Sequence, residues 1–80
     1  MNVAVEISLY PLSDAFEKPI DDFLALLAKN KKIHMESGKM SSILTGELAE
    51  IMAALAHAMN AVFNDGPAVF NLKISNCCPV

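Results

Sequence analysis

Four titratable side chains are the first candidates for chemistry: His34, His57, Glu6 and Glu36. A general acid or base must lie in a water-excluded site within reach of a substrate. None of the four belongs to a recognisable nucleophile-elbow, zinc-protease, P-loop or dinucleotide-binding motif. His34 is the better candidate of the two histidines, because it shares a predicted sheet face with Glu6 and Tyr10. We nevertheless interpret both histidines as ordinary surface residues and expect no enzymatic activity.

Sulfur ligands for a metal are few and poorly spaced. The two cysteines, Cys77 and Cys78, are adjacent, whereas metal chaperones of similar size use a Cys-x-x-Cys loop that brings two thiolates to one ion. Adjacent thiols diverge along an extended chain, and most methionines fall on predicted core faces. We expect no metal and no cofactor.

Composition limits the remaining classes of function. The chain has 80 residues, of which 54% are hydrophobic and 19% charged, with a mean hydropathy of +0.39. Intrinsic disorder is excluded, yet a single domain of this length buries only about 60% of its unfolded surface. Six lysines, no arginine and nine carboxylates give a net charge of -3, which argues against nucleic acid as a partner. We expect one domain over residues 1–80.

The start of the chain lacks the positively charged segment of a secretory signal. The longest apolar stretch, Leu48 to Phe63, is interrupted by three polar residues and is shorter than the roughly 20 residues that a membrane span needs. Adjacent cysteines that form no disulfide framework fit a reducing compartment. We therefore expect a cytoplasmic protein with no membrane partner.

Hydrophobic periodicity predicts six elements in the order βαββαβ. Alternating residues predict strands over 3–10, 33–36, 39–45 and 69–75. A helical stripe predicts a first helix that is regular from about Pro19, after a capping pattern at Asp14, and that ends at the lysines of 29–32. The inward-facing stripe consists of Phe16, Ile20, Phe23, Leu24 and Leu27. Gly46 and Glu47 begin a second helix, and the stop signal Asn-Asp-Gly-Pro at 64–67 ends it. Its expected buried stripe is Leu48, Ile51, Met52, Leu55, Met59, Val62 and Phe63.

The two middle strands are expected to form a tight hairpin. A two-residue loop at Ser37-Gly38 would place Glu36 opposite Lys39 and Met35 opposite Met40. This register puts Met40 on the buried face and turns Ser42 toward the helices. A bulge or a longer turn would reverse the direction of Ser42.

Right-handed crossovers fold this order into a ferredoxin-like α+β sandwich. The four-stranded antiparallel sheet has strand order 4-1-3-2, and both helices cover one face. The other face, called the open face below, has no helix over it. It comprises Ala4, Glu6, Ser8, Tyr10, His34, Glu36, Ser41, Ile43, Thr45, Val69, Asn71 and Lys73. Its mixture of polar and apolar side chains predicts docking against a partner, most simply a second copy of the chain.

The open face also offers the groups that hold a small flat ligand. A tyrosine ring, carboxylates and neutral hydroxyl and amide groups suit a polar and cationic molecule. A polar sheet face buried in a dimer explains the same residues equally well.

Three segments resemble a known family, the small thiamine-binding proteins with a YkoF-like ferredoxin fold. They are the opening strand from Val3 to Leu12, the segment from Met40 to Glu47 with its Met, hydroxyl and Gly-Glu pattern, and the last strand from Val69 to Ser75. The resemblance implies homodimers or homotetramers through sheet faces or edges, and binding of thiamine or its hydroxymethylpyrimidine part without catalysis. Ser42 stands where the family usually has Thr.

Together, the residues and the resemblance predict a non-enzymatic, oligomeric binder of thiamine or a related pyrimidine. The expected ligand-binding residues are Glu6, Ser8, Tyr10, Ser42, Thr45 and Asn71. The alternative is a structural or regulatory interaction domain with no small ligand.

Overall fold

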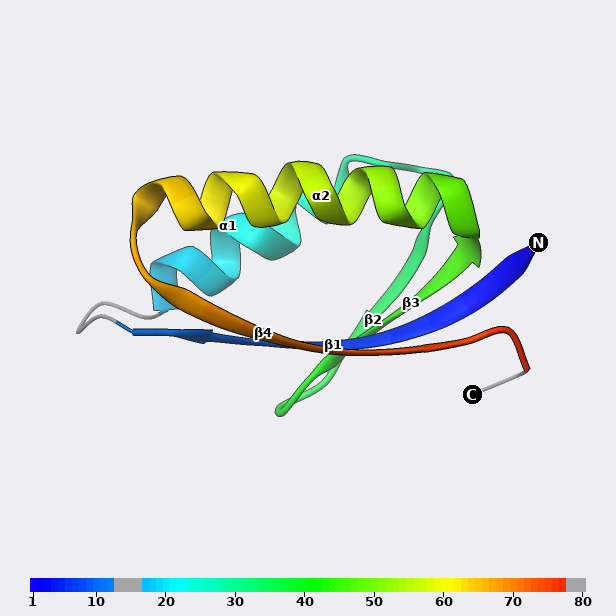
Figure 1. The fold of residues 1–80 in the computed structure, drawn as a ribbon, viewed down its shortest axis with the longest axis horizontal. Coiled ribbons are helices and arrows are strands. Elements are labelled where there is room, and N and C mark those ends of the chain that lie inside the picture. The colour runs from blue at the N-terminus through cyan, green and yellow to red at the C-terminus, as the bar shows by residue number, and fades with distance from the viewer. Residues whose placement is uncertain (13–16, 78–80) are drawn as a thin grey trace.

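The computed structural model describes residues 1–12 and 17–77 and has the predicted element order. The elements are β1 (Asn2–Pro11), α1 (Glu17–Ala28), β2 (His34–Ser37), β3 (Ser42–Glu47), α2 (Leu48–Asp65) and β4 (Ala68–Ser75). The strands form one antiparallel sheet in the order β2-β3-β1-β4, and both helices lie on the same side of it (Figure 1). Read from the other edge, this order is the predicted 4-1-3-2, so the ferredoxin-like sandwich is confirmed.

The core lies between the helices and the inner face of the sheet. Alternation along β1 turns Val5 and Ile7 inward, where 0% and 2% of their surface is exposed. Phe23 and Leu27 cover them from α1, and Leu55 covers them from α2. The excess of apolar residues in the composition is therefore largely absorbed by one helix-on-sheet core.

The first helix begins earlier than expected. It starts at Glu17, so that Pro19 lies in its first turn, where the missing N–H of proline breaks no helical hydrogen bond. The predicted cap at Asp14 lies outside the described residues. After Ala28, the N–H groups of Lys29 and Asn30 bond back to the carbonyls of Leu26 and Leu27.

The second helix buries a narrower face than predicted. Ile51, Leu55, Ala58 and Val62 are its buried residues. Met52 and Phe63 were expected in the core, but 45% and 49% of their surface is exposed. The prediction was too wide because it included apolar residues at both edges of the stripe, and Met52 and Phe63 lie at those edges rather than on the face that meets the sheet.

The predicted register of the β2–β3 hairpin was wrong, but the prediction that Ser42 faces the helices was right. Met35 pairs with Leu44 and Glu36 with Ile43, and the loop has four residues, closed by the N–H of Gly38 donating to the carbonyl of Ser41 (2.8 Å). This register buries Leu44 completely against the core, whereas the predicted one would carry it beyond the end of β2. Met40 consequently lies in the loop and is 88% exposed, and Glu36 does not face Lys39.

Within the described residues, no helix has both the length and the apolar character needed to cross a membrane.

Candidate functional site

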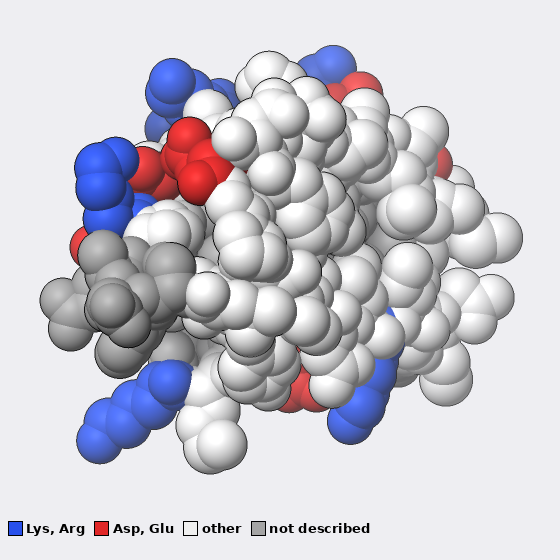
Figure 2. Space-filling view, turned by 60° about the vertical axis from the view of Figure 1, so that its left-hand side comes forward, with Lys and Arg blue, Asp and Glu red and all other residues white. Residues whose placement is uncertain are grey.

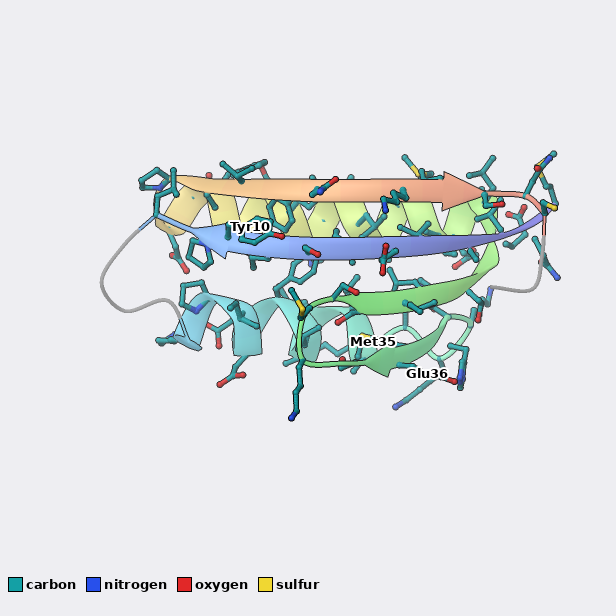
Figure 3. All side chains as sticks on the ribbon, turned by 90° about the horizontal axis from the view of Figure 1, so that it is seen from below. Tyr10, Met35 and Glu36 are labelled. Atoms are coloured by element: carbon teal, nitrogen blue, oxygen red, sulfur yellow. The ribbon has the colours of Figure 1, made fainter. Side chains whose placement is uncertain are left out.

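Four predicted site residues are close neighbours on the open face. Strand β1 presents Glu6, Ser8 and Tyr10 there in succession, and β4 places Asn71 directly opposite Ser8. Figure 3 looks onto this face, with the helices behind the sheet and Tyr10 on β1. The structure therefore brings Glu6, Ser8, Tyr10 and Asn71 together, as the alternation predicted.

The carboxylate of Glu6 already has partners. Ser41 Oγ donates to its Oε2 at 3.0 Å, and Lys73 Nζ lies 3.8 Å from its Oε1. A cationic ligand would have to compete with Lys73 for this charge. Glu6 is thus better placed to order the hairpin loop, through Ser41, than to receive a cation.

Tyr10 makes one end of the open face apolar. Its side chain is 52% exposed, and Val69, its partner on β4, is 49% exposed. Two such residues side by side form an apolar surface that water covers at a cost in free energy. This end of the face is suited to an aromatic ring or to another protein surface.

Thr45 lies at the opposite end of the open face from Tyr10. It pairs with Ala4 on one side and with His34 on the other. Tyr10 lies six positions after Ala4 on β1, which is about 20 Å along a strand. The structure therefore does not bring Thr45 into one site with Tyr10.

Ser42 lies on the opposite face of the sheet from the other five. It pairs with Ile7 and is 7% exposed, among the inward-facing residues. There it lines a pocket of about 130 Å³, called the hairpin pocket below, between β1, the start of α1 and the β2–β3 loop. The pocket is lined by Ile7, Ser8, Leu9, Ile20, Phe23, Leu24, Gly38, Lys39, Met40, Ser41 and Ser42.

The polar groups of the hairpin pocket are uncharged apart from Lys39. Ser42 Oγ lies 3.2 Å from Ser37 Oγ, and Ser8 Oγ donates to the carbonyl of Met40 at 3.2 Å. Two serine side chains therefore bind the loop to β1: Ser8 donates to the loop carbonyl of Met40, and Ser41 of the loop donates to Glu6. These contacts hold hydroxyl and backbone groups beside an apolar wall from α1, an arrangement suited to a polar heteroaromatic ring.

Sequence reasoning missed most of this pocket. It found Ser42 and Ser8, but not Ile20 and Leu24 of α1 or the loop residues. The exposed Met40 was expected in the core. The periodicity of α1 did mark Ile20 and Leu24 as inward-facing, but which sheet residue they approach depends on how the layers stack.

A wider hollow lies on the outer side of the same loop. It measures about 400 Å³ and is lined by Glu36, Ser37, Gly38, Lys39, Met40, Ser41 and Ile43. The loop from Gly38 to Ser41 borders both hollows, so its conformation sets the shape of each.

Comparison with known proteins identifies the family of this chain. The profile of the YKOF-related Family matches residues 2–80. The chain belongs to this family. No curated protein matches the sequence closely enough to be counted as a relative.

Solved structures share the fold of this YKOF-related chain. A hypothetical protein from Methanocaldococcus jannascii is 29% identical, with a TM-score of 0.85 over 96% of this chain and 81% of that one. A protein from Streptococcus pneumoniae is 23% identical, with a TM-score of 0.86 over 94% and 86%. A candidate thiamine biosynthesis/salvage protein from Thermotoga maritima is 20% identical, with a TM-score of 0.85 over 96% and 85%.

The shifted pKa values of this YKOF-related chain lie outside the hairpin pocket. A hydrogen bond from the N-terminal amine and another from the N–H of Ala49 lower the pKa of Glu47, at the start of α2. A hydrogen bond to Asp22 raises the pKa of Lys18, on α1. Among the described residues, no group of three His, Cys, Asp or Glu side chains is placed to hold a metal ion. Cys77 is an exposed free thiol, and Cys78 lies outside the described part.

Proposed function

We propose that this protein is a non-enzymatic binder of thiamine or its hydroxymethylpyrimidine part, and that the hairpin pocket receives the pyrimidine ring. The observation that carries the proposal is a buried hydroxyl, Ser42, on the wall of a pocket in a YKOF-related chain. A candidate thiamine biosynthesis/salvage protein of the same fold supports the choice of ligand.

The size of the pocket favours one ring rather than a whole cofactor. Pockets for drug-sized ligands measure about 300–1,000 Å³, whereas the hairpin pocket measures about 130 Å³. The second ring of thiamine would extend past Met40 toward the outer hollow, which shares the loop with the pocket. Met40 is exposed there, and its sulfur is a suitable neighbour for an aromatic ring.

The chemistry of the lining favours binding over catalysis. The groups nearest to Ser42 are hydroxyls, backbone and aliphatic side chains, which orient a ligand but transfer no proton at neutral pH. Ser8 joins the pocket to the open face, so Glu6, Tyr10 and Asn71 are within reach of a ligand that extends from it. Thr45 lies three residues after Ser42 on β3, about 10 Å along the strand and on the other face of the sheet. It is therefore left out of the proposed site.

Self-association is the second part of the proposal. Tyr10 and Val69 are half exposed on the open face, and a second copy would cover them. A sheet-mediated homo-oligomer also accounts for the apolar excess that one 80-residue core leaves over.

Calorimetry with thiamine and with hydroxymethylpyrimidine tests the ligand. We expect both to bind, and Ser42→Ala to weaken the affinity about tenfold, as for loss of one buried hydrogen bond. Thr45→Ala is the matched control, because it removes a hydroxyl from the same strand on the other face, and its affinity should not change. No heat with either ligand at millimolar concentration would rule out the binding hypothesis and favour the alternative, an interaction domain with no small ligand.

A further inference from the structure

A second hollow, the interhelix groove, lies between α1 and α2 on the far side of Phe23. It measures about 340 Å³, within the range of small-molecule sites. Phe23 is the only residue that it shares with the hairpin pocket. The groove is therefore a separate site that the proposed function does not use.

The floor of the groove is apolar and rigid. Phe23 is 2% exposed and Val62 is 5% exposed, and both belong to the core. Leu26 from α1 and Ala61 from α2 complete the walls. Because Ala61 is small, the space above it is not filled by the protein's own side chains.

The charges of the groove are arranged by sign along its length. The two helices run in opposite directions, so the end of α2, with Asp65, lies beside the start of α1 (Figure 1). Asp22 lines the groove near the same end, and Lys29 follows it by seven residues, which is about 10 Å along a helix. The groove is thus acidic at one end and basic at the other.

Asp65 is the groove carboxylate that forms no salt bridge among the described residues, although, in addition to the hydrogen bond with Asp22, its charge helps to raise the pKa of nearby Lys18. Lys18 Nζ lies 2.7 Å from Asp22 Oδ2 and occupies that carboxylate. Among the described residues, neither Asp65 nor Lys29 forms an ion pair. Figure 2 shows acidic and basic side chains close together along one edge of the molecule, beside a largely uncharged surface.

From this arrangement we infer that the interhelix groove binds a small amphipathic molecule with an ammonium at one end, an apolar middle and a carboxylate at the other. The ammonium lies at Asp65, the apolar middle lies over Phe23 and Ala61, and the carboxylate lies at Lys29. A molecule that carries only one of the two charges lacks one of these contacts and binds more weakly.

Two-dimensional NMR titration with 6-aminohexanoate tests this inference, with hexanoate and hexylamine as half-probes. We expect amide shifts at α1 and at the end of α2, and affinity about two- to fivefold higher for 6-aminohexanoate than for either half-probe, as one additional exposed ion pair allows. No shift at 20 mM, shifts elsewhere on the molecule, or equal affinity for the three probes would overturn the inference.

Two variants locate the site and separate it from the hairpin pocket. Ala61→Leu fills the groove and should abolish the shifts, whereas Ala56→Leu, on the exposed side of the same helix, should leave them unchanged. Asp65→Asn should reduce 6-aminohexanoate to the affinity of hexanoate. Thermal unfolding confirms that each variant folds, and thiamine binding should be unaffected by Asp65→Asn. Equal 6-aminohexanoate binding by the Ala61→Leu variant would refute the placement.

Discussion

Glu47 shows how one side chain can serve two elements. Its Oε1 accepts the N–H of Ala49 at 3.0 Å, which caps α2, and its Oε2 lies 3.2 Å from the N-terminal amine, which precedes β1. Both contacts favour the ionised carboxylate, so its pKa is lowered in the folded state.

The pH dependence of stability follows from that direction. A lowered folded-state pKa contributes stability above the unfolded value near 4.5, and this contribution disappears as pH falls through the folded value. We expect Glu47→Gln to melt at a lower temperature than the natural chain at pH 7, with the difference shrinking below about pH 4. Melting curves followed by circular dichroism provide the measurement.

Glu36→Gln is the matched control for this carboxylate. Glu36 is exposed on β2, and the one polar partner of its carboxylate among the described residues is His34 Nε2, at 3.2 Å. Its substitution should leave the melting temperature nearly unchanged at either pH. A difference for Glu47→Gln that stays constant down to pH 3 would show that the charge of Glu47 does not matter.

The orientation of α2 on the sheet decides which of its apolar residues are buried. Leu55 is 1% exposed and Met52 is 45% exposed, although the sequence pattern placed both in one stripe. Leu55→Ala should lower the free energy of unfolding by about 2–5 kcal/mol, because it leaves a cavity in the core. Met52→Ala should lower it by about 1 kcal/mol or less. Urea unfolding measures both, and equal losses would contradict the observed orientation of α2.

Gly46 of β3 lies tightly against the backbone that connects α1 to β2. A Cβ there would lie 3.3 Å from the carbonyl oxygen of Lys32, and at an ordinary contact distance of 3.6 Å from Ile51 Cδ1. Gly46→Ala should therefore destabilise the fold by about 1–3 kcal/mol through overpacking. Thr45→Ala, one residue earlier on the open face, should have a smaller effect. An unchanged urea midpoint for Gly46→Ala would mean that the backbone at Lys32 moves aside easily.

Much of the fold follows from local patterns, whereas the candidate site does not. Period-2 and period-3.6 patterns predicted the six elements, because each element buries one face. The hairpin pocket instead depends on how Ile20 and Leu24 stack over a loop that starts 14 residues later, at Gly38. No periodicity encodes that contact, so the sequence could identify Ser42 but not its surroundings.

The open face decides the proposed oligomeric state of the whole molecule. Sedimentation should give a mass of at least twice 8.6 kDa at micromolar concentration, because in our proposal a second copy covers Tyr10 and Val69. Val69→Lys should shift the protein to the monomer by placing a charge in that interface. Met52→Lys, on the helix side, should not change the mass. A monomer for the natural chain, or dissociation by Met52→Lys alone, would rule out the sheet interface.

The length of the β2–β3 loop has little influence on which face of the sheet Ser42 occupies, even though Ser42 directly follows this loop in the sequence. Strand β3 pairs with β1 over six positions, from Asn2↔Glu47 to Ile7↔Ser42, and with β2 over only four. A residue added to or removed from the loop would therefore slide the short edge strand β2, while β1 keeps Ser42 turned inward. Relatives with loops of different length can thus keep the same pocket wall and vary only its rim.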